Sequence, residues 1–517
     1  MRKILLSVGM LWMACTMAWA QQAMPATEFM QTISADDFKA HLYFLADDLL
    51  EGRETGERGQ HLAAIYIRAQ FMRLGLKPGN IQDDTYFQKY YLNRTKIKDV
   101  KMTIDGVEMT YPKDFVTASG GVVEKLDGEM VFAGYGIETA DYNNLEGLEI
   151  EGKIAVAMLG RPDNMEKPTS RFAFVETLRK RKQALQEKGA KAVVMVVPDS
   201  TYKVIRRYAR RSSISISGEK IQGPTGIYIS QTAASQFLPS KKMDMAGIQA
   251  ALNTSAEVPN LKLKKKKFAL ESDVEMTSKE ASNVLSVLEG TDLKDEYVVI
   301  TGHYDHVGTD KDGVVYNGAD DDGSGTTAVL EIAEAFVKAA EAGNRPRRSI
   351  IFMTVSGEEK GLLGSEFYTD NPIYPLAQTV TNLNIDMIGR IDNRYADKED
   401  ARNYVYVIGS DKLSSDLHAI HEEANKQYTN LTLDYKYNDE NDPNRFYYRS
   451  DHYNFAKNKI PIIFYFNGTH VDYHKPGDDP YKIEFEKAAK IAQLAFVTAW
   501  EVANRDERPV VDKEDNR

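Results

Sequence analysis

The second half of the chain alternates short apolar runs with longer segments of helical periodicity. Runs that are rich in β-branched and aromatic residues and end in glycine or polar residues are typical of buried strands. They lie at 297–308, 349–357, 381–389, 403–410 and 460–466. Segments 325–341 and 484–503 carry apolar residues at helical spacing between or after these runs. Alternation of this kind predicts an α/β fold, with a mixed, mainly parallel central sheet sandwiched by helices.

The first half of the chain has two different textures. Residues 35–77 show helical periodicity on both sides of a Gly-rich break at 52–59, and Ser34 or Asp36 can cap the first helix. From about 105 to 258 the chain changes to short β-like runs, joined by loops and one charged helix. The β-like runs are 129–137, 152–159 and 190–198, and the helix is 174–189. We therefore predict a helical part at 21–104, an inserted β-rich domain at 105–258 and a catalytic domain at 259–517.

The first twenty residues have the pattern of a secretory signal. Arg2 and Lys3 precede a short apolar stretch that ends in Ala18-Trp19-Ala20, which predicts cleavage before Gln21. A lipoprotein signal with Cys15 as acceptor is the lesser alternative, because Trp12 and Met13 fit poorly where that signal has an aliphatic and a small residue. No run is long enough to span a bilayer. The sequence predicts an exported, periplasmic or extracellular protein without stable membrane insertion.

The cysteine count and the net charge limit the kinds of metal site and partner that the protein can have. Cys15 is the one cysteine of the 517 residues, so a mature chain would have no disulfide, and this suits a bacterial exported protein. A metal site would have to use His, Asp and Glu. The formal net charge is −11, and it argues against nucleic acid as a partner. The basic run 262–267 is more typical of a solvated face or linker than of a binding patch.

Side chains that can bind metal gather at four predicted strand ends and at one predicted helix start, which follows the aspartate triplet. They are His303 and Asp305, the triplet Asp320 to Asp322, the pair Glu358 and Glu359, Asp386, and His474. In open α/β sheets such ends face one binding crevice. Charges beside core strands must be paired or metal-bound.

The number and kind of these ligands indicate two zinc ions. Two histidines, one aspartate of the triplet, one glutamate of the pair and Asp386 are too many ligands for one catalytic zinc. They suit two zinc ions that share a bridging carboxylate. One glutamate of the 358–359 pair would bind metal, and the other would stay free to take a proton from the activated water. Asp305, two residues after His303, could accept the second ring N–H of His303 and so select its tautomer.

The ordered motifs resemble the co-catalytic two-zinc exopeptidases. This family includes secreted bacterial leucyl-type aminopeptidases and, more distantly, glutamate carboxypeptidase and the transferrin receptor ectodomain. The motifs are "GHYDHVG", "NGADDDGSGT", "SGEEKGLLGS", "NIDMIGR" and "YHKPGDD", and "DDLLEGRETGERG" resembles the family's opening helices. The resemblance implies a zinc exopeptidase (phosphorylase/hydrolase-like) fold over 282–505. The inserted region resembles a protease-associated domain more loosely.

The resemblance also implies roles for individual residues. His303 and Asp386 would hold one zinc, Glu359 and His474 the other, and Asp321 would bridge them. The residues alone do not decide which aspartate of the triplet bridges. Glu358 would be the general base. The resemblance further implies that Tyr473 helps to hold the oxyanion and that Asp451 or His452 lies in the outer shell. His306 and His470 receive no role, and "HAIHEE" (418–423) is interpreted as a surface helix rather than a zinc site.

The implied activity is hydrolysis of the N-terminal peptide bond of peptides that have a free N-terminus. A zinc glutaminyl cyclase and a non-catalytic binding protein on the same scaffold are alternatives, although the complete ligand set favours hydrolysis. A carboxypeptidase or dipeptidase preference stays open, as do the preferred residue, the role of the inserted domain and the oligomeric state. Absence of a GxSxG motif disfavours a serine hydrolase.

Overall fold

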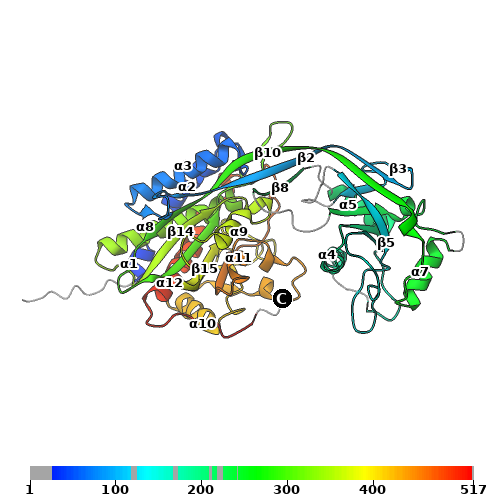
Figure 1. The fold of residues 1–517 in the computed structure, drawn as a ribbon. Helices are drawn as coiled ribbons and strands as arrows, with labels where there is room; N and C mark the ends of the chain where they lie inside the picture. Colours follow the sequence, from blue (N-terminus) through cyan, green and yellow to red (C-terminus); the bar gives the residue numbers. More distant parts are fainter. Residues whose placement is uncertain are drawn as a thin grey trace, which may run out of the picture.

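The structure is a computed structural model, and it describes residues 26–117, 125–166, 173–208, 212–217, 225–240 and 243–514. The predicted export signal, with Cys15, lies outside the described residues. Two lobes are joined by a long pair of strands (Figure 1). The main lobe contains both the N-terminal helices and the C-terminal half of the chain.

A mixed sheet forms the centre of the main lobe. Its strands, in spatial order, are β17 (Thr432–Asp434), β16 (Tyr404–Ile408), β18 (Ile462–Phe466), β15 (Thr379–Ile385), β11 (Leu293–His303), β14 (Arg348–Val355) and β10 (Lys267–Leu288). Strands β18, β15, β11 and β14 are parallel, whereas β16 and β10 run antiparallel to their neighbours in that group. The predicted α/β class with a mainly parallel sheet is confirmed.

Helices cover both faces of this sheet. Successive side chains of each strand point alternately into the core on one face and the core on the other. Ile350 and Phe352 of β14 join the core beneath α8 and α12, while Ile351 and Met353 join the core on the opposite face. Because both faces are buried, β14 carries the continuous apolar run Ile350–Met353. The first face carries α1 (Ala26–Met30), α2 (Ala35–Leu45), α3 (Arg58–Arg73), α8 (Gly325–Glu341), α10 (Ser415–Ala424) and α12 (Phe485–Asn504). The second carries α9 (Leu363–Asp370) and α11 (His452–Ala456).

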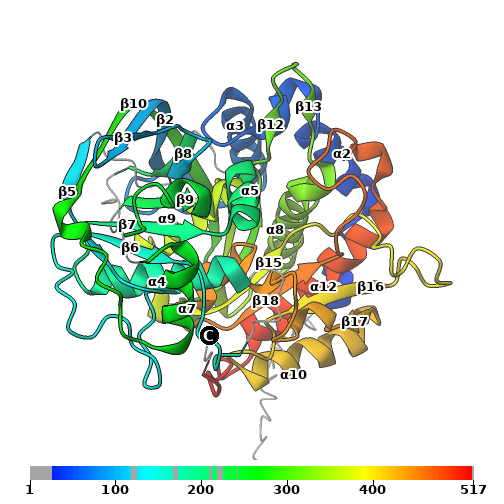
Figure 2. The same ribbon diagram turned by 90° about the vertical axis from the view of Figure 1, so that its right-hand side faces the viewer.

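The N-terminal segment packs against the loops at the carboxyl ends of the strands. Ser34 caps α2 by accepting the N–H of Asp37, as one of the two predicted caps. The 3₁₀ turn η1 (Asp48–Arg53) follows α2 and contacts the hairpin of β12 (Gly308–Thr309) and β13 (Val315–Tyr316) (Figure 2). Gly52 has φ +66°, and a Cβ there would collide with the carbonyls of Gly308 and Tyr316. The Gly-rich break therefore permits a close backbone approach.

A long antiparallel arm connects the lobes, and the sequence analysis did not predict it. Strand β2 (Phe87–Ile104) pairs with β10 along most of its length, with one irregularity between Asp273 and Val274. Much of the arm is exposed, so its strands are polar and lack the apolar runs that marked the buried strands. Short strands β1 (Lys77–Pro78), β3 (Val107–Met109) and β8 (Ser212–Ile216) pair with it.

The second lobe continues the sheet beyond β10. Its strands β5 (Lys125–Phe132), β6 (Ile154–Met158), β7 (Ala192–Val197) and β9 (Thr225–Ser230) are parallel, and β4 (Phe115–Thr117) is antiparallel to β9. Helices α4 (Ala173–Glu187), α5 (Asp199–Tyr208), α6 (Gln231–Ala234) and α7 (Met245–Thr254) accompany them. The lobe has its own apolar core. Its domain boundaries and its likeness to a protease-associated domain stay predictions.

Candidate metal centre

The candidate site lies at the carboxyl ends of the parallel strands. His303 is the last residue of β11, and Asp386 follows β15 directly. Glu358 and Glu359 follow β14 after Gly357, whose φ of +75° turns the chain. Asp321 lies in the turn Ala319–Ser324 (η3), which opens α8. His474 is in the loop after β18.

These predicted ligands meet around Asp321. Its Oδ1 lies 3.4 Å from Nε2 of His303, and its Oδ2 lies 3.0 Å from Nε2 of His474. Asp386 Oδ1 is 3.7 Å from Nε2 of His303, and Glu359 Oε2 is 3.1 Å from Nε2 of His474. The five residues therefore form two imidazole–carboxylate groups that share one aspartate.

The donor atoms of this cluster fit metal ions. Nε2 of His303, Oδ2 of Asp321 and Oε1 of Glu359 are buried and form no hydrogen bond of normal geometry, although imidazole nitrogens lie 3.0 Å from Oδ2 of Asp321 and 2.9 Å from Oε1 of Glu359. Buried polar atoms are normally satisfied, and converging carboxylates repel one another unless cations lie between them. Imidazole nitrogens and carboxylate oxygens are the donors of zinc sites without cysteine.

Asp322 lies close enough to His303 and Asp386 to share a metal with them, but both flanking aspartates of the triplet accept backbone N–H groups, and the carboxylate of Asp321 does not. Asp322 accepts N–H groups of His303, Gly325 and Met387 through its two oxygens. Asp320 accepts the N–H of Gly389 and the hydroxyl of Ser324 through Oδ1, and the side-chain amide of Asn467 through Oδ2. Both flanking carboxylates thus anchor backbone.

The backbone of Asp321 is held by the carboxylate of Asp478. Oδ2 of Asp478 accepts the N–H groups of both Asp320 and Asp321, at 3.0 and 3.1 Å. Burial and the nearby Asp320 raise the pKa of Asp478 to about 6. The sequence analysis missed this residue, although "YHKPGDD" contains it.

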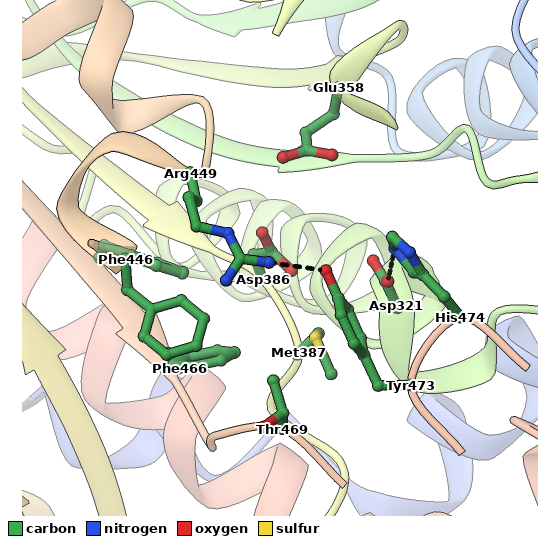
Figure 3. A pocket seen from close by; sticks show the side chains of 11 residues that line it. Asp321, Glu358, Asp386, Met387, Phe446, Arg449, Phe466, Thr469, Tyr473 and His474 are labelled. Carbon is green, nitrogen blue, oxygen red and sulfur yellow. Dashed lines mark hydrogen bonds and ion pairs between the residues drawn. The ribbon is translucent and has the colours of Figure 1, made fainter. Parts of the chain in front are cut away.

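Glu358 lies on the open side of the same cluster. Its Oε2 is 3.9 Å from Nε2 of His303, and Figure 3 shows its carboxylate facing the pocket opposite Asp386. Burial raises the pKa of Glu358 well above its ordinary value, and Glu359 adds to the rise while His303 opposes it. For Glu359, burial would raise the pKa, but His306 and His474 outweigh it and lower the pKa to about 2. The two adjacent glutamates therefore differ in basicity.

Asp305 supports the site in a different way from the one predicted. Nδ1 of His303 lies 3.1 Å from the backbone oxygen of Asp305 and 3.7 Å from its carboxylate. The carboxylate is engaged elsewhere, because it accepts the hydroxyl of Thr55 at 2.6 Å and the N–H of Glu358 at 3.2 Å. The backbone carbonyl is thus the nearer partner of the ring N–H, and the carboxylate connects His303's loop to Glu358.

Tyr473 and Asp451 lie around the cluster. The Tyr473 ring stacks on His474 with 4.0 Å between centroids, and its hydroxyl accepts an N–H of Arg449 at 3.1 Å. Asp451 is buried and accepts the hydroxyl of Ser365 at 2.5 Å. Burial raises the pKa of Asp451 to about 7. His452 is buried and faces the carbonyl of Tyr447.

The sequence analysis missed two further groups at the site. Nδ1 of His306 lies 2.9 Å from Oε1 of Glu359, and His306, Asp321 and Glu359 together could hold a metal. A second histidine in "GHYDHVG" was its only signal. Ser450 donates its hydroxyl to Oδ2 of Asp386 at 2.6 Å, and the spacing of the motifs does not indicate it.

The histidine pair of "HAIHEE" is structural. It lies on α10, where His421 is buried and contacts Thr498 and Tyr465, whereas His418 contacts Ser410. Burial lowers the pKa of His421 to about 3, so its ring is neutral. Neither residue is in a group of possible metal ligands within the described chain.

Residues 283–499 match the model of peptidase family M28. The match confirms the resemblance to the zinc exopeptidases and contains every residue of the cluster. The M28 segment begins in β10 and ends in α12, so it comprises the metal centre and the sheet that supports it.

Curated relatives match short parts of the chain. A probable zinc metalloprotease of Pyricularia oryzae is 37% identical over 118 residues, which are 22% of this chain and 20% of the relative. Aminopeptidase NAALADL1 of Rattus norvegicus is 38% identical over 109 residues, 21% of this chain and 14% of the relative. The chain therefore spans a fifth or less of the length of these relatives.

The fold is shared over nearly the whole chain with a solved structure. The aminopeptidase from Aneurinibacillus sp. strain AM-1 superimposes with a TM-score of 0.53 at 19% identity, over 95% of this chain and 99% of that one. This likeness concerns the fold. No helix within the described residues combines the length and apolar character needed to cross a membrane.

Proposed function

We propose that this protein is a two-zinc metallo-exopeptidase, and specifically an aminopeptidase that hydrolyses the N-terminal peptide bond. The observation that carries the proposal is the position of Asp321, whose two oxygens face His303 and His474. Such a shared carboxylate suits a pair of ions rather than one. His303 and Asp386 would hold one zinc, and Glu359 and His474 the other.

Zinc bound here would supply the positive charge that polarises the scissile carbonyl and activates the attacking water. Glu358 would take the proton of that water and return it to the leaving amine. Its raised pKa suits both tasks, because a base of very low pKa would hold the proton too weakly. The hydroxyl of Tyr473 points into the same pocket and would donate to the oxyanion (Figure 3).

The experiment is a metal count on protein purified without added metal, combined with turnover of a leucyl peptide and a glutaminyl peptide before and after chelation. Two zinc ions per chain and chelator-sensitive release of the N-terminal amino acid are expected. One zinc with a cyclised glutaminyl product would instead indicate a cyclase. No metal and no turnover after zinc is restored would indicate a binding protein.

The role of Glu358 has its own test in Glu358→Gln. Gln keeps the size of the side chain but cannot take a proton, so kcat should fall by about 10²–10⁴-fold. Zinc content should stay at the wild-type value, because Glu358 holds no metal in this proposal. Turnover close to wild type with zinc retained would refute the mechanism.

We also propose that the protein is exported. Support comes from the basic, apolar and small-residue pattern of residues 1–20 and from a mature chain without cysteine. N-terminal sequencing of the protein recovered from the producing cell should start at Gln21. A start at Met1 in a cytoplasmic fraction would refute export.

A further inference from the structure

An arginine stands in the pocket beside the metal centre. The pocket is lined by Asp321, Glu358, Asp386, Met387, Phe446, Arg449, Phe464, Phe466, Thr469, Tyr473 and His474. In Figure 3 the Arg449 guanidinium lies between Phe446 and Tyr473, and Glu358 and Asp386 face the same space. A positively charged side chain beside candidate metal ligands is unexpected, because it would repel the metal ions. Arg449 therefore needs a separate explanation.

The guanidinium is held in place without being neutralised. Its carbon lies 4.7 Å from the ring centroid of Phe446, and one N–H is donated to the Tyr473 hydroxyl at 3.1 Å. Within the described residues, Arg449 contacts the Phe446 ring and the Tyr473 hydroxyl and forms no ion pair with a carboxylate. Arginine has five N–H donors in a fixed fork that matches a carboxylate, so most of its donors remain open to a ligand.

Part of the pocket wall is apolar. Met387, Phe446, Phe464 and Phe466 are buried side chains that contribute to the pocket. A group that fits here combines a short apolar stem with a terminal negative charge, since the stem packs on the rings and the charge reaches Arg449. A purely aliphatic side chain would leave the cation without an anionic partner.

We propose that Arg449 binds a carboxylate of the substrate and so makes this enzyme selective for carboxylate-bearing peptides. Two sources share this chemistry: the side chain of an N-terminal Glu or Asp, and the α-carboxylate of a dipeptide. The inference rests on the proposed peptidase function. Arg449 is a specificity-determining residue in this scheme, whereas bond cleavage is left to Glu358 and the metals.

The test compares Arg449→Met with wild type on two substrate pairs. Glutamyl- and leucyl-p-nitroanilide differ in the side-chain carboxylate, and leucyl-glycine and leucyl-glycinamide differ in the C-terminal one. Met preserves length and packing on Phe446 but removes the charge. Charge-assisted hydrogen bonds justify an expected loss of about 10–100-fold in the ratio of kcat/KM within one of the pairs.

Arg445→Met is the matched control. Arg445 lies over the ring of Tyr448 at 4.7 Å and does not line the pocket. Its removal should leave both ratios unchanged. Zinc content of each variant is measured to show that the metal centre is intact.

The outcomes separate the inference from the function on which it rests. Loss confined to the glutamyl pair identifies the side-chain carboxylate, and loss confined to the glycine pair identifies the α-carboxylate. If wild type hydrolyses these substrates but both ratios survive Arg449→Met, the inference is wrong and the peptidase stands. If zinc-loaded wild type hydrolyses none of the four, the proposed function itself fails.

Discussion

The hydroxyl of Thr55 donates to Oδ2 of Asp305 at 2.6 Å, and this bond joins residues 250 positions apart in the chain. Oδ1 of the same carboxylate accepts the N–H of Glu358. The N-terminal segment thus positions the loop of His303 and the proposed base together. The N-terminal segment therefore supports the candidate metal centre through Asp305 rather than by providing one of the candidate ligands.

Thr55→Val should weaken the metal centre. Val keeps the shape of the side chain but leaves Asp305 without its buried donor, and loss of such an outer contact typically costs about 10–100-fold in metal affinity or activity. Zinc affinity by chelator competition and kcat on a leucyl substrate measure the effect. Thr291→Val is the control, because the exposed Thr291 donates to Asp292 away from the site. Equal zinc affinity in both variants would contradict the role of Thr55.

Arg53→Met should destabilise the main lobe. The buried Arg53 guanidinium donates to the carbonyls of Tyr304, Leu45, Asn317 and Gly318, which belong to segments distant in sequence. Burial lowers the pKa of Arg53 to about 10, so the group remains charged at neutral pH. Met would leave buried carbonyls without donors, at a cost of more than about 3 kcal/mol.

Chemical denaturation of zinc-loaded protein measures this loss. Arg58→Met is the control for Arg53, because Arg58 forms an exposed ion pair with Glu51 and should change stability by less than about 0.5 kcal/mol. A loss below about 1 kcal/mol for Arg53→Met would show that its four contacts are dispensable.

Glu331→Gln should change how stability depends on pH. Burial raises the pKa of Glu331 to about 8, and the neighbouring Asp37 and Glu334 add to the rise. The folded chain therefore binds a proton that the unfolded chain releases above about pH 4.5, so wild-type stability falls as pH rises towards 8. Gln has no proton to lose and should be more stable than wild type at pH 9, by on the order of 2–4 kcal/mol.

Thermal unfolding at pH 5, 7 and 9 measures the Glu331 effect. Glu334→Gln is the control on the same helix. Burial would raise the pKa of Glu334, but Arg73 and Lys338 lower it, so its stabilising effect is present at neutral pH and is lost as pH falls through its folded pKa. That variant should be slightly less stable at pH 7. Parallel pH profiles for wild type and Glu331→Gln would contradict a protonated Glu331.

Metal removal should lower the thermal stability of the main lobe. Without cations, the carboxylates of Asp321, Glu359 and Asp386 repel one another in a buried cluster, and a ligand at 100 times its Kd stabilises the fold by about 2.7 kcal/mol. Chelation should therefore lower Tm by about 5 °C or more, and zinc should restore it. Asp321→Asn should abolish most of the zinc-dependent part. A Tm that does not respond to chelation would count against a resident metal.

The sequence by itself predicted strands β11, β14, β15, β16 and β18 and helices α8 and α12 of the main lobe, and it nominated a set of candidate ligands beside them. Runs such as Ile350 to Val355 are buried on both faces, and this burial imposes an apolar pattern that can be read locally. Most candidate ligands could be named because they follow a predicted strand, and Asp321 because it precedes a predicted helix. The exposed arm of β2 and β10 has no such pattern, and its existence depends on pairing between distant segments.

Only the tertiary structure decided which polar groups satisfy one another. It shows that the carboxylates of Asp320 and Asp322 accept backbone N–H groups whereas that of Asp321 does not, and it brings Thr55, His306 and Arg449 to the site. Hydrogen bonds and ion contacts depend on short distances in space, and residues far apart in the chain leave no periodic trace of them. Candidate ligands could therefore be named from the sequence, while the contacts that hold them in place could not.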